Sequence, residues 1–311
     1  VVDGKGLKMS KSLGNVIAPE EILKKYGADI LRVWVAASNY AEDLRIDYSI
    51  LEQHAEAYRK IRNTFRYILG NLNDKFSEQN FSKIDISKLP ELEQYMLHKI
   101  SILNENFHKN FDNYTFHNLY KELLNFCTVD LSAFYFDIRK DTLYCDNLNS
   151  VKRKSSITLL NILLDCLLKW FAPILSFTTE EIYSLVAKNN NDSIHLKKFI
   201  KTPNNWSNKN LNEKWEKLKK IRDVANISIE SKRAEKIIGS SLEANIKIRL
   251  KQNLFDFAKN FDFAELCITS AAEVLLDKNQ TEEISVETLK AEGNKCKVCW
   301  KITKGKCERH G

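Results

Sequence analysis

The sequence has little glycine and proline for its length, and it has no long uncharged apolar run. Nine glycines and four prolines among 311 residues leave few turn positions, which excludes a many-turned β architecture and favours long helices. No apolar stretch reaches the roughly 18 uncharged residues that a membrane-spanning helix needs, and no signal peptide is visible. These absences predict a cytoplasmic protein with no membrane partner.

The seven cysteines lack the even spacing of a disulfide framework in a small secreted domain. Three of them fall within the last sixteen residues of the chain. The other four are scattered among apolar or aromatic neighbours, and we expect them to be buried, unpaired thiols: Cys127, Cys145, Cys166 and Cys267.

Charge of one sign is not strongly in excess, because the net charge is only +7. Nucleic acid is a reasonable partner for such a chain, although the charge alone does not establish one. The first residue is Val1 rather than methionine, and it lies in what reads as a loop. We therefore expect the chain to be part of a longer protein.

Apolar periodicity predicts a mainly helical protein. Helices are expected at 19–34 with a break at Gly27, and at 48–74, 91–110, 114–136 and 150–188, the last kinked at Pro173. Residues 74–90 and 137–147 read as connections, and 193–208 as a loop with an edge strand. A basic helix at 211–236 precedes three strands, at 244–250, 264–270 and 283–291, with a short helix at 253–261.

The opening segment "GKGLKMSKSLGN" carries three lysines and two serines between glycines. Glycines let a loop move and bring backbone close to a ligand, and lysine ammonium groups suit the oxygens of a phosphate chain. Lysine–serine loops are more often solvated surface, so composition alone leaves both interpretations open.

The chain ends in Cys296-x2-Cys299, seven residues, and Cys307-x2-His310. Three thiolates and one imidazole within fifteen residues form a complete tetrahedral donor set for structural zinc. A Cys296–Cys299 disulfide is less plausible in a reducing compartment. Trp300 lies among several lysines here, and it can stack on a base or cover the metal.

The order of these phrases resembles the class I aminoacyl-tRNA synthetases of the isoleucine, valine and leucine branch. "KMSKS" at Lys8–Ser12 matches the second signature loop of that class, and the following "LGNVIAPEEILKKYGADILRVWVAAS" looks like its continuation. Four further phrases, spread from Tyr40 to Trp300, are similar to the C-terminal part of bacterial-type isoleucyl-tRNA synthetases: "YAEDLRID", "YRKIRNTFRYILGNLND", "IGSSLEAN" and "CKVCW". The resemblance covers essentially the whole chain in order.

That resemblance implies an ATP-dependent ligase that joins isoleucine to tRNA(Ile) through an isoleucyl-adenylate. It implies that ATP, with Mg2+, meets the signature loop through Lys8, Met9, Ser10, Lys11 and Ser12. Lys11 is then the principal catalytic cation on the leaving pyrophosphate, with Lys8 assisting. No "HIGH"-type signature, nucleotide-binding sheet or editing insertion is visible, so we do not expect the chain to activate isoleucine alone.

The same resemblance implies four divisions of the chain. Residues 1–46 end a catalytic domain, 47–207 form a helical anticodon-binding bundle, 208–292 add a basic helix and a small α/β domain, and 293–311 form a zinc module. The family's terminal module usually has four cysteines, so "CERH" departs from the pattern. His310 lies one residue from the end, and the identity of the fourth zinc ligand stays open.

Contacts to the tRNA are expected from basic and aromatic side chains in the bundle, the basic helix and the tail, although surface charges without a ligand are equally common. The residues are Arg59, Arg62, Arg66, Lys219, Lys220, Arg222, Arg233 and Trp300. The other expected partner is the missing N-terminal catalytic and editing part of the same enzyme. We expect that enzyme to be a monomer. Two alternatives remain: a freestanding tRNA-binding module derived from a synthetase, and a valyl or leucyl enzyme.

Overall fold

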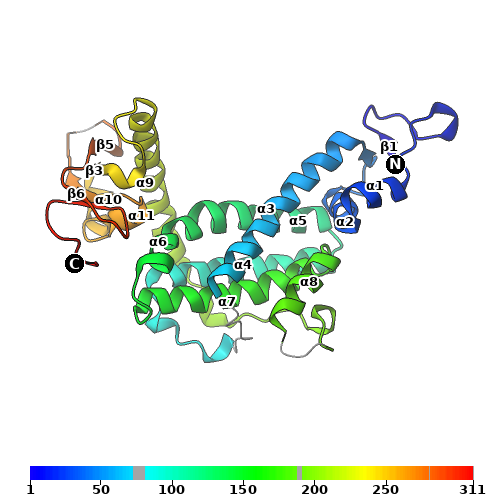
Figure 1. Ribbon diagram of the computed structural model, residues 1–311, viewed down its shortest axis with the longest axis horizontal. Helices are drawn as coiled ribbons and strands as arrows, with labels where there is room; N and C mark the ends of the chain where they lie inside the picture. The colour runs from blue at the N-terminus through cyan, green and yellow to red at the C-terminus, as the bar shows by residue number, and fades with distance from the viewer. Residues whose placement is uncertain (73–80, 188–190, 280, 311) are drawn as a thin grey trace. The chain divides into compact units, whose positions relative to one another are not determined.

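The computed structural model describes residues 1–72, 81–187, 191–279 and 281–310. The chain divides into two compact units, which are described separately here (Figure 1). The first unit joins Val1–Asp137 with Lys154–Ser207, and the second joins Ile138–Arg153 with Asn208–Gly311. The segment 138–153 therefore packs with the C-terminal unit, although the chain passes through it between two helices of the first.

The first unit opens with a loop held by two short parallel strands, β1 (Val2–Asp3) and β2 (Arg45–Ile46). Helix α1 (Pro19–Tyr26) begins with proline in its first turn, where the missing N–H costs nothing. Gly27, at φ 83°, then turns the chain into α2 (Ala28–Ala37), which confirms the predicted break. The long helix α3 (Tyr48–Leu72) follows.

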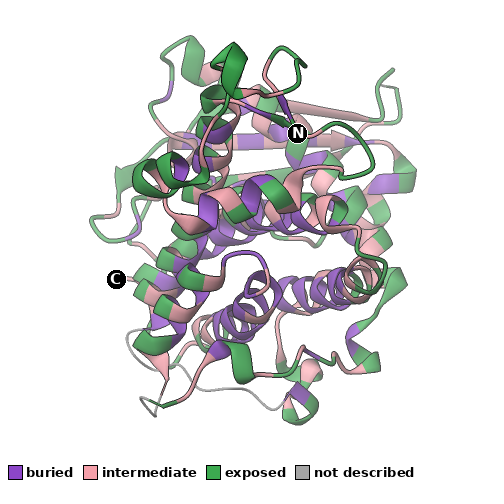
Figure 2. Cartoon of the chain, turned by 90° about the vertical axis from the view of Figure 1, so that its right-hand side faces the viewer, coloured by how far each residue is buried: buried purple, intermediate pink, exposed green. Residues whose placement is uncertain are grey.

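The remaining helices of this unit form the predicted bundle. They are α4 (Glu91–Asp112), α5 (Phe116–Asn125), a π-helical segment Phe126–Phe136, α7 (Val151–Phe171) and α8 (Ser176–Val186), with α6 (Asp137–Cys145) leading into the second unit. Helix α4 packs on α5, and α3 packs on the π-helical segment. Fourteen residues of α7 are buried, so this helix is apolar almost all round, and Figure 2 shows the buried faces of the bundle helices.

The predicted kink at Pro173 is a complete break between two helices. Proline has no N–H to donate, and α7 ends at Phe171, two residues before it. The turn is closed by Ile174 and Leu175, whose backbone N–H groups both donate to the Phe171 carbonyl, at 2.9 and 2.7 Å. Helix α8 then starts at Ser176.

Two residues of α2, Asp29 and Arg32, form hydrogen bonds with the backbone groups around this break. The buried Asp29 carboxylate accepts hydrogen bonds from the backbone N–H groups of Phe177 (3.3 Å) and Thr178 (2.7 Å), and from the Thr178 hydroxyl (2.6 Å). Arg32 donates to the carbonyls of Ile174 (2.9 Å) and Pro173 (2.7 Å). Asp29 is thus an N-terminal cap for α8 supplied from about 150 residues earlier in the chain.

Replacing Asp29 by alanine is expected to destabilise the first unit by roughly 2–4 kcal/mol, because the buried N–H and hydroxyl of Thr178 and the part-buried N–H of Phe177 lose a charged acceptor. Hydrogen exchange of the α8 amides in increasing urea measures this change. Asp85→Ala is the matched control, since Asp85 caps an exposed turn at Ser87 (3.2 Å) and should change stability by well under 1 kcal/mol. Equal effects of the two substitutions would contradict the role given to Asp29.

The second unit is built on the basic helix α9 (Lys209–Ala234) and a three-stranded sheet. Strand β3 (Ala244–Leu250) lies in the centre, parallel to β4 (Ala271–Leu276) and antiparallel to β5 (Ile284–Lys290). Alternate residues of β3 are buried, and α9 packs on β5. Two short helices, α10 (Gln252–Ala258) and α11 (Phe263–Leu266), connect β3 to β4, and a hairpin of β6 (Asn294–Lys295) and β7 (Ile302–Thr303) closes the unit.

Three expectations about local structure are wrong. Residues 137–147 are largely helix α6 rather than a connection, because their buried face packs within the second unit. The strand expected at 264–270 begins only at Ala271, after α11. Short 3-10 turns at Ile194–Leu196 and Asn204–Trp206 stand where an edge strand was expected, and no strand occurs within the described residues of 193–208. Of the loop expected at 74–90, residues 74–80 lie outside the described ranges.

No helix in the described ranges is both long and apolar enough to cross a membrane.

Candidate catalytic loop and metal centre

The loop Lys8–Ser12, which the sequence analysis identifies as the expected signature loop, presents its two lysines to solvent and is anchored by its methionine. Lys8 and Lys11 are exposed and form no ion pair within the described residues. Met9 is half-buried and packs against a small core that includes Ile22, Trp34 and Leu51. Met9 thus anchors the loop, while its two lysines have no ion-pair partner among the described residues.

Serine and asparagine side chains shape the backbone of this loop. Ser10 caps a 3-10 turn at Lys11–Leu13 by accepting from Leu13 N at 3.3 Å, and its hydroxyl lies 3.1 Å from that of Ser12. Asn15 accepts from Ser10 N at 2.9 Å and donates to the Asp3 carboxylate at 2.9 Å. Lys11 therefore stands at the first position of a defined turn.

Asp3 and Asn15 form a brace that the sequence analysis did not single out. Asp3 also accepts from the backbone N–H groups of Leu7 (2.8 Å) and Lys5 (3.0 Å). The hydrogen bond from Asn15, followed by that from Leu7, lowers the pKa of Asp3. The only signal in the sequence is the pair of short polar residues flanking a glycine-rich loop, which is too common to identify a brace.

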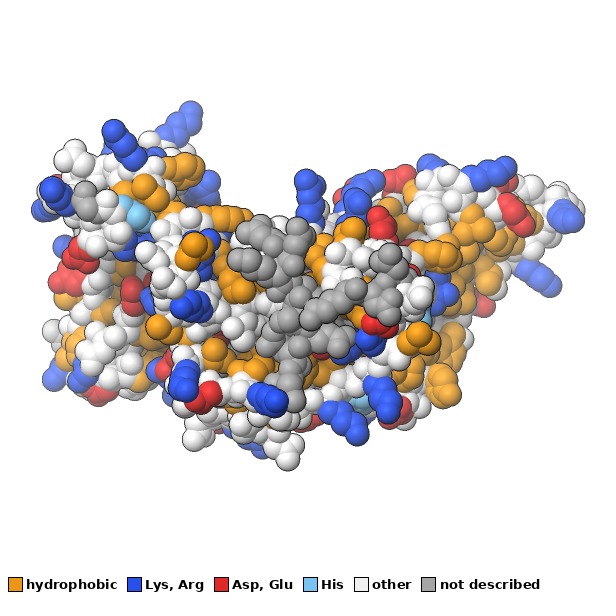
Figure 3. All heavy atoms as spheres, turned by 60° about the horizontal axis from the view of Figure 1, so that its bottom comes forward, with side chains coloured by type: hydrophobic (Ala, Val, Ile, Leu, Met, Phe, Trp, Pro, Cys, Tyr) orange, Lys and Arg blue, Asp and Glu red, His pale blue; other side chains and the backbone are white. Residues whose placement is uncertain are grey.

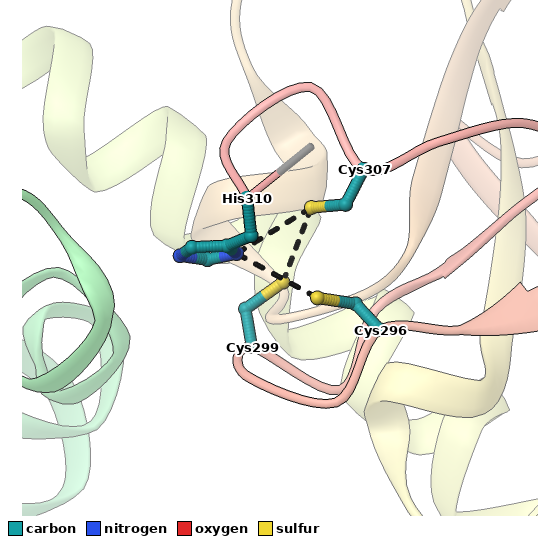
Figure 4. A group of neighbouring side chains, drawn as sticks. All are labelled: Cys296, Cys299, Cys307 and His310. Carbon is teal, nitrogen blue, oxygen red and sulfur yellow. Dashed lines mark hydrogen bonds between the residues drawn. The ribbon is translucent and has the colours of Figure 1, made fainter.

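The terminal metal cluster consists of Cys296, Cys299, Cys307 and His310, whose ligand atoms all lie within 4.8 Å of one another (Figure 4). Cys299 Sγ lies 3.7 Å from Cys307 Sγ, and His310 Nδ1 lies 3.6 and 3.5 Å from the sulfurs of Cys296 and Cys307. Sulfur and nitrogen ligands placed tetrahedrally about zinc are roughly 3.8 Å (S–S) and 3.6 Å (S–N) apart. The donor set and its spacing therefore fit a tetrahedral zinc ion.

The first half of the cluster is the loop of the β6–β7 hairpin. Cys296 N donates to Lys301 O at 2.9 Å, and Trp300 N donates to Cys296 O at 3.1 Å. Gly293 has a φ of 131°, and a Cβ there would lie 2.2 Å from Thr303 O, so only glycine fits at the base of the hairpin. Trp300 is 59% exposed with a φ of 63°, a left-handed conformation that costs a tryptophan free energy.

Two thiols of the cluster have opposite environments. Backbone N–H groups of Cys299 and Val298 point at the Cys296 sulfur and lower its pKa to about 6, which favours the thiolate that a metal needs. Burial raises the pKa of Cys299 to about 11, and this side chain is only 3% exposed. A cation bound among the four ligands would offset the cost of a buried thiolate at Cys299.

The second half of the cluster is held by the segment Asp141–Asp146, which we call the anchor segment. The backbone carbonyl of Cys145 lies 3.0 Å from His310 Nε2, and Arg309 forms ion pairs with both Asp141 and Asp146. Cys145 was expected to be a buried structural thiol, and this is wrong. Cys145 is only half-buried. Its Sγ lies 3.6 Å from Val298 O in the C-terminal hairpin, which packs against α6.

The three bundle arginines share one exposed face of α3. Arg59, Arg62 and Arg66 are all exposed, at the spacing that places helical residues side by side. Arg59 pairs with Glu56, whereas Arg62 and Arg66 have no ion-pair partner within the described ranges.

The basic residues of α9 differ from one another. Arg222 is buried, and its Nε donates to Leu266 O at 3.0 Å, so it holds α11 and does not reach solvent. Arg233 pairs with Glu230 at 2.6 Å, Lys219 lies 3.6 Å from Glu216, and Lys220 is exposed. On the face in Figure 3, basic side chains are scattered among acidic and apolar ones rather than gathered in one block.

Comparison with known families defines the class of protein. Residues 93–248 match the anticodon-binding domain of tRNA ligase, which is half of the chain, and residues 1–47 match the class I tRNA synthetases (I, L, M and V). The chain belongs to the tRNA ligases that carry this anticodon-binding domain.

Within that class, the chain is similar along its whole length to isoleucine–tRNA ligases, which confirms the predicted resemblance. It is 68% identical to the ligase of Pelagibacter ubique over 310 residues, covering 100% of this chain and 34% of that protein. It is 43% identical to the ligase of Agrobacterium fabrum, covering 97% of this chain and 32% of that protein. The chain thus spans about a third of the length of these relatives, which are aminoacyl-tRNA ligases.

A solved structure of low sequence identity shares the fold. The ternary complex of Agrobacterium radiobacter LeuRS with tRNA and LeuAMS matches with a TM-score of 0.50 and 13% identity, over 80% of this chain and 25% of that chain. The match supports a mainly helical architecture of the synthetase type.

Proposed function

We propose that the chain supplies the second signature loop and the tRNA-binding parts of an isoleucine–tRNA ligase. The observation that carries this proposal is the 68% identity to such a ligase along the full chain. Residues 1–46 then complete a catalytic domain, 47–207 form the anticodon-binding bundle, 208–292 add a basic helix and a small α/β domain, and 293–311 form a zinc module. The ligase acts as a cytoplasmic monomer on tRNA(Ile).

The signature loop acts in the first chemical step, in which the isoleucine carboxylate attacks the α-phosphorus of ATP. Negative charge then grows on the pyrophosphate leaving group. The ATP that supplies this group binds together with Mg2+. The exposed Lys11 ammonium meets that charge, with Lys8 beside it, while Ser10 and Ser12 hold the turn. A cation placed where charge develops stabilises the transition state by about 3–4 kcal/mol.

The metal cluster has a structural role. Zinc bound by Cys296, Cys299, Cys307 and His310 leaves no open coordination position for a substrate, so it serves folding rather than chemistry. It cross-links the two halves of the terminal module and so presents Trp300 and the neighbouring lysines to RNA. Trp300 keeps a strained backbone and an exposed ring, which favours stacking on an unpaired base over covering the metal.

Phosphate contacts come from exposed cations of both units. Arg62 and Arg66 of α3 are the strongest candidates, because neither has an ion-pair partner within the described residues, and Arg59, Lys219, Lys220 and Arg233 can join them. Arg222 is left out, because its guanidinium is buried. Such contacts position the RNA without reading its sequence.

The double substitution Arg62→Gln and Arg66→Gln is expected to weaken tRNA binding and to reduce the slope of log K against log salt by about 1–2, since each lost phosphate contact removes slightly less than one released counterion. Filter binding between 50 and 300 mM salt measures the slope. The matched control is Lys83→Gln and Lys88→Gln, which removes two exposed charges outside the proposed surface. An unchanged slope in the first variant would remove α3 from the interface.

A full-length ligase that contains this chain tests the proposal as a whole. It should form isoleucyl-adenylate in an ATP–pyrophosphate exchange assay and charge tRNA(Ile) with isoleucine in preference to valine and leucine. Charging of valine or leucine would support a different member of the same branch. Tight tRNA binding with no adenylate formation would support a freestanding binding module instead.

A further inference from the structure

The anchor segment, Asp141–Asp146, contacts both halves of the terminal metal cluster. On one side Cys145 O and the two aspartates hold His310 and Arg309. On the other side Cys145 Sγ meets Val298 O, inside the first Cys-x2-Cys loop, at 3.6 Å. A segment about 150 residues earlier in the chain therefore touches each half of the cluster.

The contact at His310 determines which ring nitrogen carries the hydrogen, and therefore which one has a lone pair for a metal. A backbone carbonyl only accepts hydrogen bonds, so Nε2 must carry the hydrogen that it donates to Cys145 O. In the neutral ring Nδ1 then has a free lone pair, and it is this atom that lies 3.6 and 3.5 Å from Cys296 Sγ and Cys307 Sγ. Metal-bound histidines are commonly oriented by such a second hydrogen bond.

The contact at Arg309 fixes the backbone next to the ligand. Its two terminal nitrogens each meet a different carboxylate, Asp141 and Asp146, whose side chains are 24% and 15% exposed. A side chain in a segment without helix or strand loses conformational entropy when it becomes a metal ligand, and His310 lies in such a segment. Pairing of Arg309 with two carboxylates removes much of that freedom in advance.

We infer that Arg309, Asp141, Asp146 and the Cys145 carbonyl are positioning groups that make His310 the fourth ligand of the metal cluster. This inference rests on the proposed zinc site. The anchor segment orders the Cys307-x2-His310 segment through these contacts. Metal affinity and docking of the tail on α6 are therefore linked, and loss of either weakens the other.

Substitutions that remove a positive charge or two negative charges distinguish a positioning role from a simple electrostatic effect on the metal. By charge alone, Arg309→Gln should tighten binding of a cation, and the double variant Asp141→Asn with Asp146→Asn should weaken it. Positioning predicts that both variants weaken zinc binding, each by about 10–100-fold. Combining all three changes should weaken binding little more than either variant, because the groups act as one unit.

Zinc affinity of the full-length protein is measured by competition with a chromophoric chelator. The visible spectrum of the cobalt-substituted protein reports whether the coordination remains tetrahedral with three sulfurs and one nitrogen. Arg249→Gln is the matched control, because Arg249 forms an exposed ion pair with Glu287 in the same unit at 2.8 Å, and its loss should leave zinc affinity unchanged.

The outcomes distinguish the inference from the proposed zinc site. If the unaltered protein binds no zinc, the zinc site itself is wrong, and the inference falls with it. If zinc binds but Arg309→Gln binds it equally well or more tightly, the site stands and the positioning role is overturned. Weaker binding by both charge variants, with an altered cobalt spectrum, supports the inference.

Discussion

Replacing Lys11 by alanine in a full-length ligase that contains this chain is expected to lower the rate of isoleucyl-adenylate formation about 10²–10³-fold. The Kd for tRNA should change less than about twofold. Lys11 is exposed at the first position of the turn capped by Ser10, so its loss removes a cation without disturbing the Met9 anchor or the Asn15 brace. Lys11 stabilises negative charge that develops only in the transition state, so its loss lowers the rate of adenylate formation rather than the affinity for tRNA.

Single-turnover adenylate formation and filter binding of tRNA measure the two quantities separately. Lys24→Ala is the matched control, because Lys24 is an exposed lysine of α1 outside the signature loop, and it should leave the rate within a factor of two. Equal losses of rate and of tRNA affinity in Lys11→Ala would contradict its assigned role.

Replacing Cys299 by serine is expected to abolish stoichiometric zinc binding and to unfold the terminal module. Cys299 is the most buried ligand of the metal cluster, and serine is a poor zinc ligand that leaves a buried hydroxyl in its place. Binding of structural zinc supplies roughly 10–16 kcal/mol in small zinc peptides, so a module of this size should not stay folded without it.

Elemental analysis gives the zinc content, and hydrogen exchange of residues 293–310 gives the loss of protection. Removal of zinc from the unaltered protein by a chelator should reproduce both results. Cys267→Ala is the control, since Cys267 is a buried thiol of the same unit outside the cluster, and it should keep one zinc per chain. Full zinc content in Cys299→Ser would show that the cluster is not the metal site.

Local pattern was a reliable guide where one short stretch contains the whole interaction. The break at Gly27, helix α9 and strand β3 follow from a single glycine, a run of helix formers and strict alternation of apolar and polar residues. The candidate metal ligands also lie within fifteen residues, so their spacing could be read directly. Helix α6 was missed because its buried face has meaning only against the second unit.

Side-chain roles were harder to predict than elements, because burial depends on distant partners. Arg222 lies two residues after the exposed Lys220 in the same basic helix, yet Arg222 is buried and its Nε donates to the carbonyl of Leu266 in α11. Cys145 reads as a core thiol among aromatic residues, and only the return of the C-terminus to α6 makes its carbonyl a partner of His310. No spacing rule connects residues so far apart.

The sequence by itself indicated a loop with two lysines that resembles a synthetase signature, a helical bundle, and three cysteines with a histidine at zinc spacing. These features rest on residue type and short-range order, which are written directly in the chain. Only the tertiary structure decided which cations stay free, how Asp29 caps α8, and how His310 is held near the end of the chain. Those outcomes depend on hydrogen bonds and burial between residues 100 or more positions apart, which arise only when the units are folded.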